Sequence, residues 1–338
     1  MVPVRTAPVN GIFVETEVEP PSDWNESIRH GSCSQLTLFH TTAWAERMQG
    51  LLGYRPIFVT VFHDGTPILR LLALVCRWPR IRGLMNTARH SVRALTRGRS
   101  GSLIWYGEPV VIGEAGESHY RSLAEALDNE GRRRWLCVTS GNWPAAHEAS
   151  ASRNWRIRRW ATIQLDLQRP KEELLAAMKS SARKAVRRAE SDHISVRRVA
   201  CIEELRSYYA FAVTCAKRYD KRMYGFEDFR SMWDGIRPDG WFETFVAEHD
   251  GEMIAGLSVW GYGDSIGELG SFQSERSFTE KLFGPDLIKW TAIQWGHDQG
   301  LRVLDLGGVN PAPEGKDVGI RQFKEKWGGV YYEYTTIG

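Results

Sequence analysis

Residues of three kinds that could do chemistry lie close together near the end of the chain. Asp305 follows a short apolar run, Gly307 and Gly308 come directly after it, and Lys324 stands a little further on. A carboxylate can orient an amine, and glycines let a substrate approach the backbone closely. Lys324 alone would be an ordinary surface lysine, and a structural role at a strand end is the favoured interpretation of Asp305. Together, however, the four residues indicate a site.

The elements that must position these residues lie between residues 283 and 334. The sequence predicts a mostly apolar, buried helix from Gly284 to Gly300 and a short buried strand over 302–306, which the glycine pair ends. A last short helix capped by Asp317 and a strand over 330–334 follow. A strand that opens into a glycine loop beside a lysine is typical of sites at the end of an α/β sheet.

The last short helix has one apolar stripe. Ile320, Phe323 and Trp327 are spaced i, i+3 and i+7, so they fall on one face of the helix. Packing of Phe323 in that stripe would fix the direction in which the neighbouring Lys324 points.

Two blocks of sequence carry a family resemblance. GLRVLDLGG (300–308) followed by FKEKWGG (323–329) resembles the C-terminal signature of the Fem-type aminoacyltransferases, which are tandem acetyltransferase-like (GNAT) proteins. TIQLDL (162–167) followed by PKEELLAAMKSSARKAVRRAE (170–190) resembles a second block of that family in order and spacing, and TTAWAERM (41–48) fits more weakly. The match covers most of residues 36–334.

The resemblance implies an α/β fold of two tandem GNAT-like domains with mixed central sheets. The first domain is expected over residues 1–158, completed by the C-terminal strand 330–338, and the second over 159–329. The two halves share an order of helix, Asp-Gly hairpin, strand and helix, which is what a duplicated unit would show.

The resemblance also implies an activity, the transfer of an amino acid from aminoacyl-tRNA to an amine of a peptide-bearing acceptor. Lys324 and Asp305 are the expected catalytic residues, with Phe323, Gly307 and Gly308 beside the substrate. An ammonium suits the oxyanion that forms when an amine attacks an ester. No cofactor is expected, because the tRNA ester is already activated, and the chain contains no GxxxxGK[ST] sequence.

The acceptor is less closely defined by the sequence. In the family a lysine commonly follows an N-terminal tryptophan by four positions and helps to hold the acceptor's phosphates. Trp44 is present, but that position is Met48, and Arg47 is one residue away. Trp44 and Arg47 are therefore expected to bind substrate, and the acceptor is either a peptidoglycan precursor or a peptide of specialised or antibiotic metabolism.

Two basic stretches could meet an anionic partner. A single helix predicted over 171–190 carries positive residues without acids on one face: Lys179, Arg183, Lys184, Arg187 and Arg188. Lys179, Arg183 and Arg187 are expected to contact tRNA phosphates, with a solvated surface as the equal alternative. The second stretch runs from Arg77 to Arg99, and a peripheral contact with an anionic membrane surface is a third interpretation there.

Two motifs bear on rival functions. Residues 263–267 match the GxSxG nucleophile elbow, but residues 268–272 read as strand, so a hairpin turn around Ser265 is favoured over a hydrolase. An acyl-CoA-dependent N-acyltransferase normally carries a Q/R-x-x-G-x-G/A loop, which residues 274–285 lack. That function stays open as the alternative, together with a non-catalytic protein that binds tRNA or a membrane surface.

Bulk properties set the outer limits. A length of 338 residues suggests two domains, and a net charge of +3 does not by itself point to nucleic acid. Five scattered cysteines argue against a disulfide framework and a CxxC metal site. The absence of a signal-peptide pattern and of a long apolar run predicts a cytoplasmic protein without a transmembrane segment.

Overall fold

The computed structural model describes residues 4–77, 101–133, 138–218, 223, 225–236 and 240–338. They form two compact units, one of residues 1–160 with 333–338 and one of residues 161–332. We call them unit 1 and unit 2. The division falls within strand β8 (Ile157–Asp166) and within strand β14 (Val330–Ile337).

Unit 1 is built on a sheet with the order β1-β2-β3-β4-β5-β7-β14, in which β5 and β7 are the parallel pair. Its strands are β1 (Val4–Arg5), β2 (Ile12–Glu17), β3 (Arg55–His63), β4 (Thr66–Arg77), β5 (Gly101–Ile104), β7 (Val138–Pro144) and the end of β14, with β6 (Val110–Val111) paired to β4. Asp64 and Gly65 both take positive φ, so the predicted Asp-Gly hairpin forms between β3 and β4.

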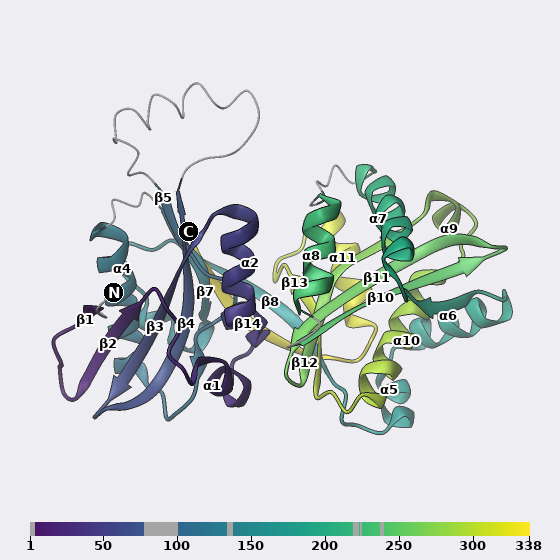
Figure 1. The fold of residues 1–338 in the computed structure, drawn as a ribbon. Coiled ribbons are helices and arrows are strands. Elements are labelled where there is room, and N and C mark those ends of the chain that lie inside the picture. Colours follow the sequence, from purple (N-terminus) through teal and green to yellow (C-terminus); the bar gives the residue numbers. More distant parts are fainter. Residues whose placement is uncertain (1–3, 78–100, 134–137, 219–222, 224, 237–239) are drawn as a thin grey trace. The chain divides into compact units, whose positions relative to one another are not determined.

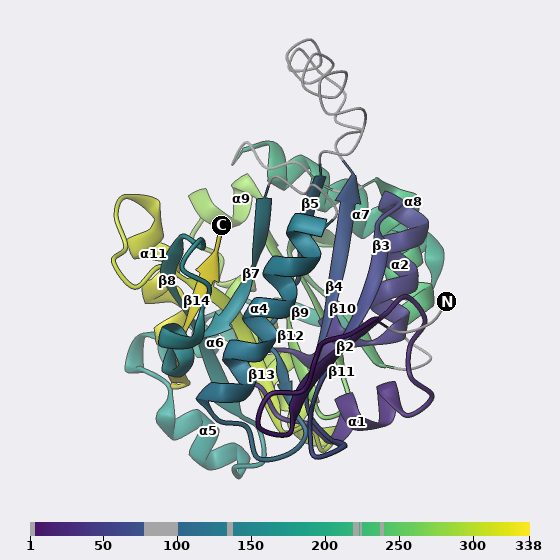
Figure 2. The same ribbon diagram turned by 90° about the vertical axis from the view of Figure 1, so that its left-hand side faces the viewer.

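The helices of unit 1 cover both faces of its sheet. Helix α4 (Glu117–Arg133) packs on β2, β3 and β7, and α2 (Thr42–Leu52) packs on β3 and β4 from the opposite side (Figure 1 and Figure 2). Alternate residues of β3 explain this, because Ile57, Val59 and Val61 join the core under α4. Helix α1 (Trp24–His30) and 3₁₀ turns at Thr37–His40 and Ala145–Ser150 complete the unit.

Unit 2 is built on a sheet with the order β8-β13-β12-β11-β10-β9. Its further strands are β9 (Ser195–Arg198), β10 (Gly240–His249), β11 (Glu252–Tyr262), β12 (Ser265–Gln273) and β13 (Val303–Val309). Neighbouring strands are antiparallel except β12 and β13, which run parallel and are joined by a crossover through α10 (Gly284–Asp298). This connection is the one that can build a site at a strand end.

Helices also cover both faces of the sheet in unit 2. Helices α5 (Lys171–Ala177), α6 (Ser180–Ser191) and α10 share one apolar core with the sheet. Helices α7 (Ile202–Lys217) and α8 (Phe226–Ile236) lie on the other face (Figure 1). Helix α9 (Glu275–Thr279) follows β12, and α11 (Lys316–Glu325) follows β13. No helix in the described parts of the chain is long and apolar enough to cross a membrane.

The single helix predicted over 171–190 is wrong, because the chain forms α5 and α6 with a break between them. Met178 and Lys179 are extended, with ψ of 144° and 149°. The backbone N–H of Lys179 leaves the helical pattern and donates to the carbonyl of Lys326 at 2.8 Å. Gly328 packs so closely against the end of α5 that a Cβ there would lie 2.5 Å from the carbonyl oxygen of Ala177.

Three details of the C-terminal stretch also differ from the prediction. Gly307 and Gly308 do not end the strand, since β13 continues to Val309 through a bulge. Asp317 does not cap α11, because Gly315 holds the N-cap position and Asp317 lies in the first turn. The apolar stripe of α11 is not buried throughout, because Ile320 is 42% exposed while Trp327 is fully buried.

Candidate active site between strands β12 and β13

The site begins where two parallel strands separate. β12 and β13 pair only through Ser265–Gly267 and Val303–Asp305. Beyond that point β12 continues against β11, and β13 continues against β8. We call the place beyond Gly267 and Asp305, where the backbones of these two strands no longer pair with each other, the opening.

Asp305 holds the bulge on the β13 side of this opening. Its carboxylate, buried at 6% exposure, accepts hydrogen bonds from Thr162 Oγ1 (2.5 Å), the Gly307 N–H (2.6 Å) and Gln164 Nε2 (3.0 Å). Burial raises the pKa of Asp305, against the lowering effect of these bonds and of Lys324. The carboxylate is thus turned into the fold, where it fixes Gly307 at a φ of 78°. The contacts that the structure shows for Asp305 are therefore structural ones.

Lys324 reaches the same bulge from α11. Its half-buried side chain donates from Nζ to the carbonyl of Gly308 at 3.0 Å, and a Cβ on Gly307 would lie 3.4 Å from Nζ. Phe323 packs edge-on against the buried Trp327, with ring centroids 6.1 Å apart, and this contact anchors the helix. The structure therefore brings Lys324, Phe323, Gly307, Gly308 and Asp305 together, as the sequence predicted.

Two buried ion pairs complete the site, and neither was predicted. Lys289 of α10, 2% exposed, pairs with Glu268, which stands on β12 directly after the last residue paired to β13. Asp286 of α10 pairs with Lys326 at 2.5 Å. Their sequence signal was the i, i+3 spacing of Asp286 and Lys289 in an otherwise apolar helix, where two charges on one buried face need partners.

Burial controls the titration of these groups. It lowers the pKa of Lys289 well below its ordinary value, and the positive charges of Lys324 and Lys326 act in the same direction. Burial raises the pKa of Asp286, which the Lys326 ammonium opposes. Shifted groups gathered at an opening are a recognised sign of a functional site.

The basic residues of α6 separate into two groups. Lys179 Nζ pairs with Glu325 of α11 at 3.4 Å, which places it beside the site. Arg183 donates to carbonyls at the end of α5, among them Ala176 at 3.1 Å, so its guanidinium caps that helix. Lys184 and Arg187 are exposed and, within the described ranges, have no side-chain partner.

The remaining predicted site residues belong to unit 1 or lie outside the described residues. Trp44, 5% exposed, packs against Phe39 with ring centroids 5.2 Å apart, and Arg47 is half-buried on the same helix, α2. The arginine-rich stretch from Arg77 to Arg99 lies almost wholly outside the described residues, which resume at residue 101.

The corresponding place in unit 1 is closed. Trp105 follows β5, its N–H continues the ladder to the carbonyl of Ser140 at 3.0 Å, and its indole is 2% exposed. The ring lies on Gly141 of β7, where a Cβ would come 2.0 Å from it. An indole thus fills the place that charged residues line in unit 2.

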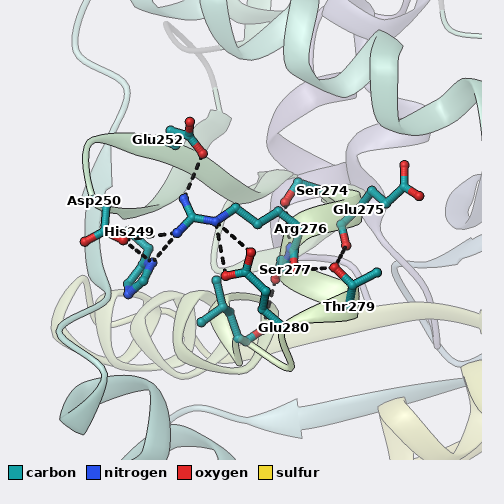
Figure 3. Close-up of polar contacts among 10 residues, drawn as sticks. His249, Asp250, Glu252, Ser274, Glu275, Arg276, Ser277, Thr279 and Glu280 are labelled. Atoms are coloured by element: carbon teal, nitrogen blue, oxygen red, sulfur yellow. Dashed lines mark hydrogen bonds and ion pairs between the residues drawn. The ribbon is translucent and has the colours of Figure 1, made fainter.

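Helix α9 takes the place of a phosphate-binding loop after β12. Arg276 fixes this helix to the β10–β11 turn, donating to Glu252 (2.8 Å), Asp250 (3.0 Å) and Glu280 (3.2 Å), as Figure 3 shows. A hollow of about 680 Å³ beside it is lined by residues such as His193, His249 and Lys281, and includes none of the site residues.

Comparison with known proteins places the fold. Residues 176–325 match the family described as an acetyltransferase (GNAT) domain. A search of curated proteins found no match. Among solved structures, FemX superposes with a TM-score of 0.69 at 13% identity, over 95% of this chain and 96% of that one.

Two further structures superpose less closely. L-PGS from Bacillus licheniformis gives a TM-score of 0.55 at 14% identity, over 94% of this chain and 91% of that one. A GCN5-related N-acetyltransferase from Sphaerobacter thermophilus gives 0.51 at 13% identity, over 96% and 94%. At these identities the likeness concerns the fold, and it confirms the predicted α/β fold of two GNAT-like domains.

Proposed function

Starting from a Fem-type tandem GNAT fold with a GNAT-type acyltransferase domain, we propose that this protein is an aminoacyltransferase. It takes an amino acid from aminoacyl-tRNA and joins it to an amine of a peptide-bearing acceptor, in the cytoplasm where aminoacyl-tRNA is made. The acceptor is a peptidoglycan precursor or a peptide of specialised metabolism. No cofactor enters the reaction, because the ester bond to tRNA supplies the driving force.

One observation carries this proposal, the placement of the Lys324 ammonium over the Gly307 bulge. Attack of an amine on the ester makes a tetrahedral intermediate with a negative oxygen. Lys324 Nζ lies 3.0 Å from the Gly308 carbonyl, and a rotation of its side chain would exchange that carbonyl for the oxyanion. Such a preorganised donor commonly contributes ~100-fold or more to the rate.

The alternative donor, an acyl-CoA, is favoured by the GNAT family match but fits this site less well. A CoA pyrophosphate needs a cradle of backbone N–H groups at a helix N-terminus. Here α9 occupies the connection after β12, and the first turn of α10 holds the buried carboxylate of Asp286. That turn already holds one anion, which pairs with Lys326, so a pyrophosphate would have to share the turn with it.

The test is an assay of transfer with both donor classes. A pool of aminoacyl-tRNA charged with radiolabelled amino acids, and separately radiolabelled acetyl-CoA, are incubated with the protein and with peptide acceptors that include a peptidoglycan precursor. We expect label in the acceptor only from the tRNA pool. Label from acetyl-CoA alone would establish the alternative, and label from neither would refute acyl transfer to these acceptors.

A further inference from the structure

The buried pair of Lys289 and Glu268 has no evident structural need for charge. Every immediate neighbour of Lys289 along α10, from Leu287 to Trp290, is otherwise apolar and buried. A well-packed apolar pair in such a position would be as stable or more so, since desolvation offsets most of the attraction between buried ions. The presence of this charged pair beside the opening therefore points to a use in the reaction.

The position of Glu268 suits proton transfer at the reacting groups. It is the first β12 residue beyond the parallel ladder, so its backbone lies where the two strands stop pairing, and its carboxylate contacts α10 beside that point. The Glu268 side chain is 11% exposed and that of Lys289 is 2% exposed, so Glu268 is the more accessible member of the pair. Glu268 can thus touch a substrate, whereas Lys289 can act only through Glu268.

We propose that Glu268 is a catalytic residue that relays one proton during aminoacyl transfer, and that Lys289 is the positioning residue that shares this proton with it. The inference rests on the proposed function. As the acceptor nitrogen forms its bond to the ester carbonyl carbon, the pair gives its proton to the departing ribose oxygen when the carbon–oxygen bond breaks. The pair then takes one proton from the nitrogen, so it ends as it began, and the amide and the free hydroxyl account for every atom.

The charges around the pair favour this direction. Once the proton has left, the pair carries one negative charge, which the Lys324 ammonium stabilises. Two carboxylates also face the region, but Asp286 is neutralised by Lys326, and Asp305 is held by its hydrogen bonds. It therefore costs the buried pair less free energy to give its proton first and to take one up afterwards than to do the reverse.

The experiment compares Glu268→Gln, Lys289→Met and the double variant with Glu275→Gln, a matched control on the exposed surface of α9. Single-turnover transfer from the radiolabelled aminoacyl-tRNA pool is followed from pH 6 to pH 8.5, with hydroxylamine as a second acceptor beside the peptides. We expect Glu268→Gln to be slower by about 100-fold or more at every pH, the usual worth of general acid–base catalysis. The control should keep the wild-type rate.

Lys289→Met separates positioning from simple support of the fold. Without its partner Glu268 is an ordinary acid that titrates on its own, so it holds a proton at low pH and loses it as pH rises. The rate of this variant should therefore approach that of the wild type near pH 6 and fall as pH rises. A merely structural role would reduce the rate equally at all pH values, in step with the melting temperature, and would overturn the positioning role.

Melting temperatures keep the outcomes distinct. Coupling of the pair predicts that the double variant melts closer to the wild type than the sum of the single losses. If wild type transfers and a folded Glu268→Gln variant stays within threefold of it, the relay is wrong while the proposed function stands. If the wild type transfers from aminoacyl-tRNA to no acceptor, hydroxylamine included, the proposed function fails and the relay with it.

Discussion

Replacement of Asp305 tests whether its carboxylate only holds the site in place or also takes part in the reaction. In Asp305→Asn the side-chain oxygen still accepts from Thr162 and the Gly307 N–H, and Gln164 can turn its amide to accept from the new NH₂ group. In Asp305→Ala all three hydrogen bonds are lost. At about 1 kcal/mol for each buried bond, Ala should lower the free energy of unfolding by about 3 kcal/mol and Asn by about 1 kcal/mol.

The two variants should differ in activity as well. Without the carboxylate, Gly307 is released from its positive φ, and the Gly308 carbonyl that receives Lys324 moves with it. We therefore expect a loss of about 100-fold in single-turnover rate for Asp305→Ala and of less than tenfold for Asp305→Asn. Urea unfolding and transfer from saturating donor would be measured on the same preparations. Equal, large losses of activity in two well-folded variants would refute the positioning role and make Asp305 a direct participant.

The pH dependence of stability gives a second check on Asp305. Burial raises its pKa in the folded protein above the ordinary 3.8, so folding takes up a proton between the two values. The stability due to this group is present below 3.8 and is lost as pH rises through the folded pKa. The Asp305→Asn variant has no titrating group at this position. Its free energy of unfolding should therefore fall less with rising pH than that of the wild type. An unchanged decline would assign it to other groups.

Three other variants test the remaining roles. Lys324→Met should lower kcat by ~100-fold with a smaller effect on KM, and a single-turnover rate within threefold of wild type, at an unchanged melting temperature, would exclude Lys324 from the chemistry. Lys184→Glu with Arg187→Glu should reduce the log–log slope of tRNA binding against salt by about two, one for each lost phosphate contact, and an unchanged slope in filter binding would leave a solvated helix face. Ser265→Ala should retain full transfer, because Ser265 Oγ donates to the neighbouring Asp264 at 2.9 Å and accepts from Arg302 at 3.5 Å, and neither contact activates a nucleophile. Labelling of Ser265 by a serine-directed phosphonate would contradict this.

Features that depend on neighbouring residues could be predicted from the sequence. The β13 strand, the last helix and the direction of Lys324 follow from local apolar spacing and from Phe323 and Trp327, so these predictions agree with the structure. The break between α5 and α6 could not be found this way, because the partner that draws Lys179 out of the helix is the carbonyl of Lys326, far along the chain. Local propensity favours one continuous helix there.

The charged half of the site was missed for a similar reason. Lys289 and Glu268 meet only because α10 packs against β12. A charge in an apolar helix indicates that Lys289 needs a partner, but no pattern within either element shows that the partner is Glu268. Arg183 shows the reverse case, since its place on a basic face suggested phosphate binding, whereas the break in the helix gives it carbonyls to cap. Both outcomes depend on tertiary packing, which overrides the local pattern.

The indole of Trp105 limits the substitutions that unit 1 can accept at the place that charged residues line in unit 2. Its ring fits only because residue 141 has no side chain, as a Cβ at Gly141 would overlap it at 2.0 Å. The substitution of either residue alone therefore leaves a cavity or a clash, so reopening unit 1 requires two coordinated changes through a less stable intermediate. Such a pair works as a ratchet: a substitution at either position alone costs stability, so the closed place in unit 1 tends to stay closed.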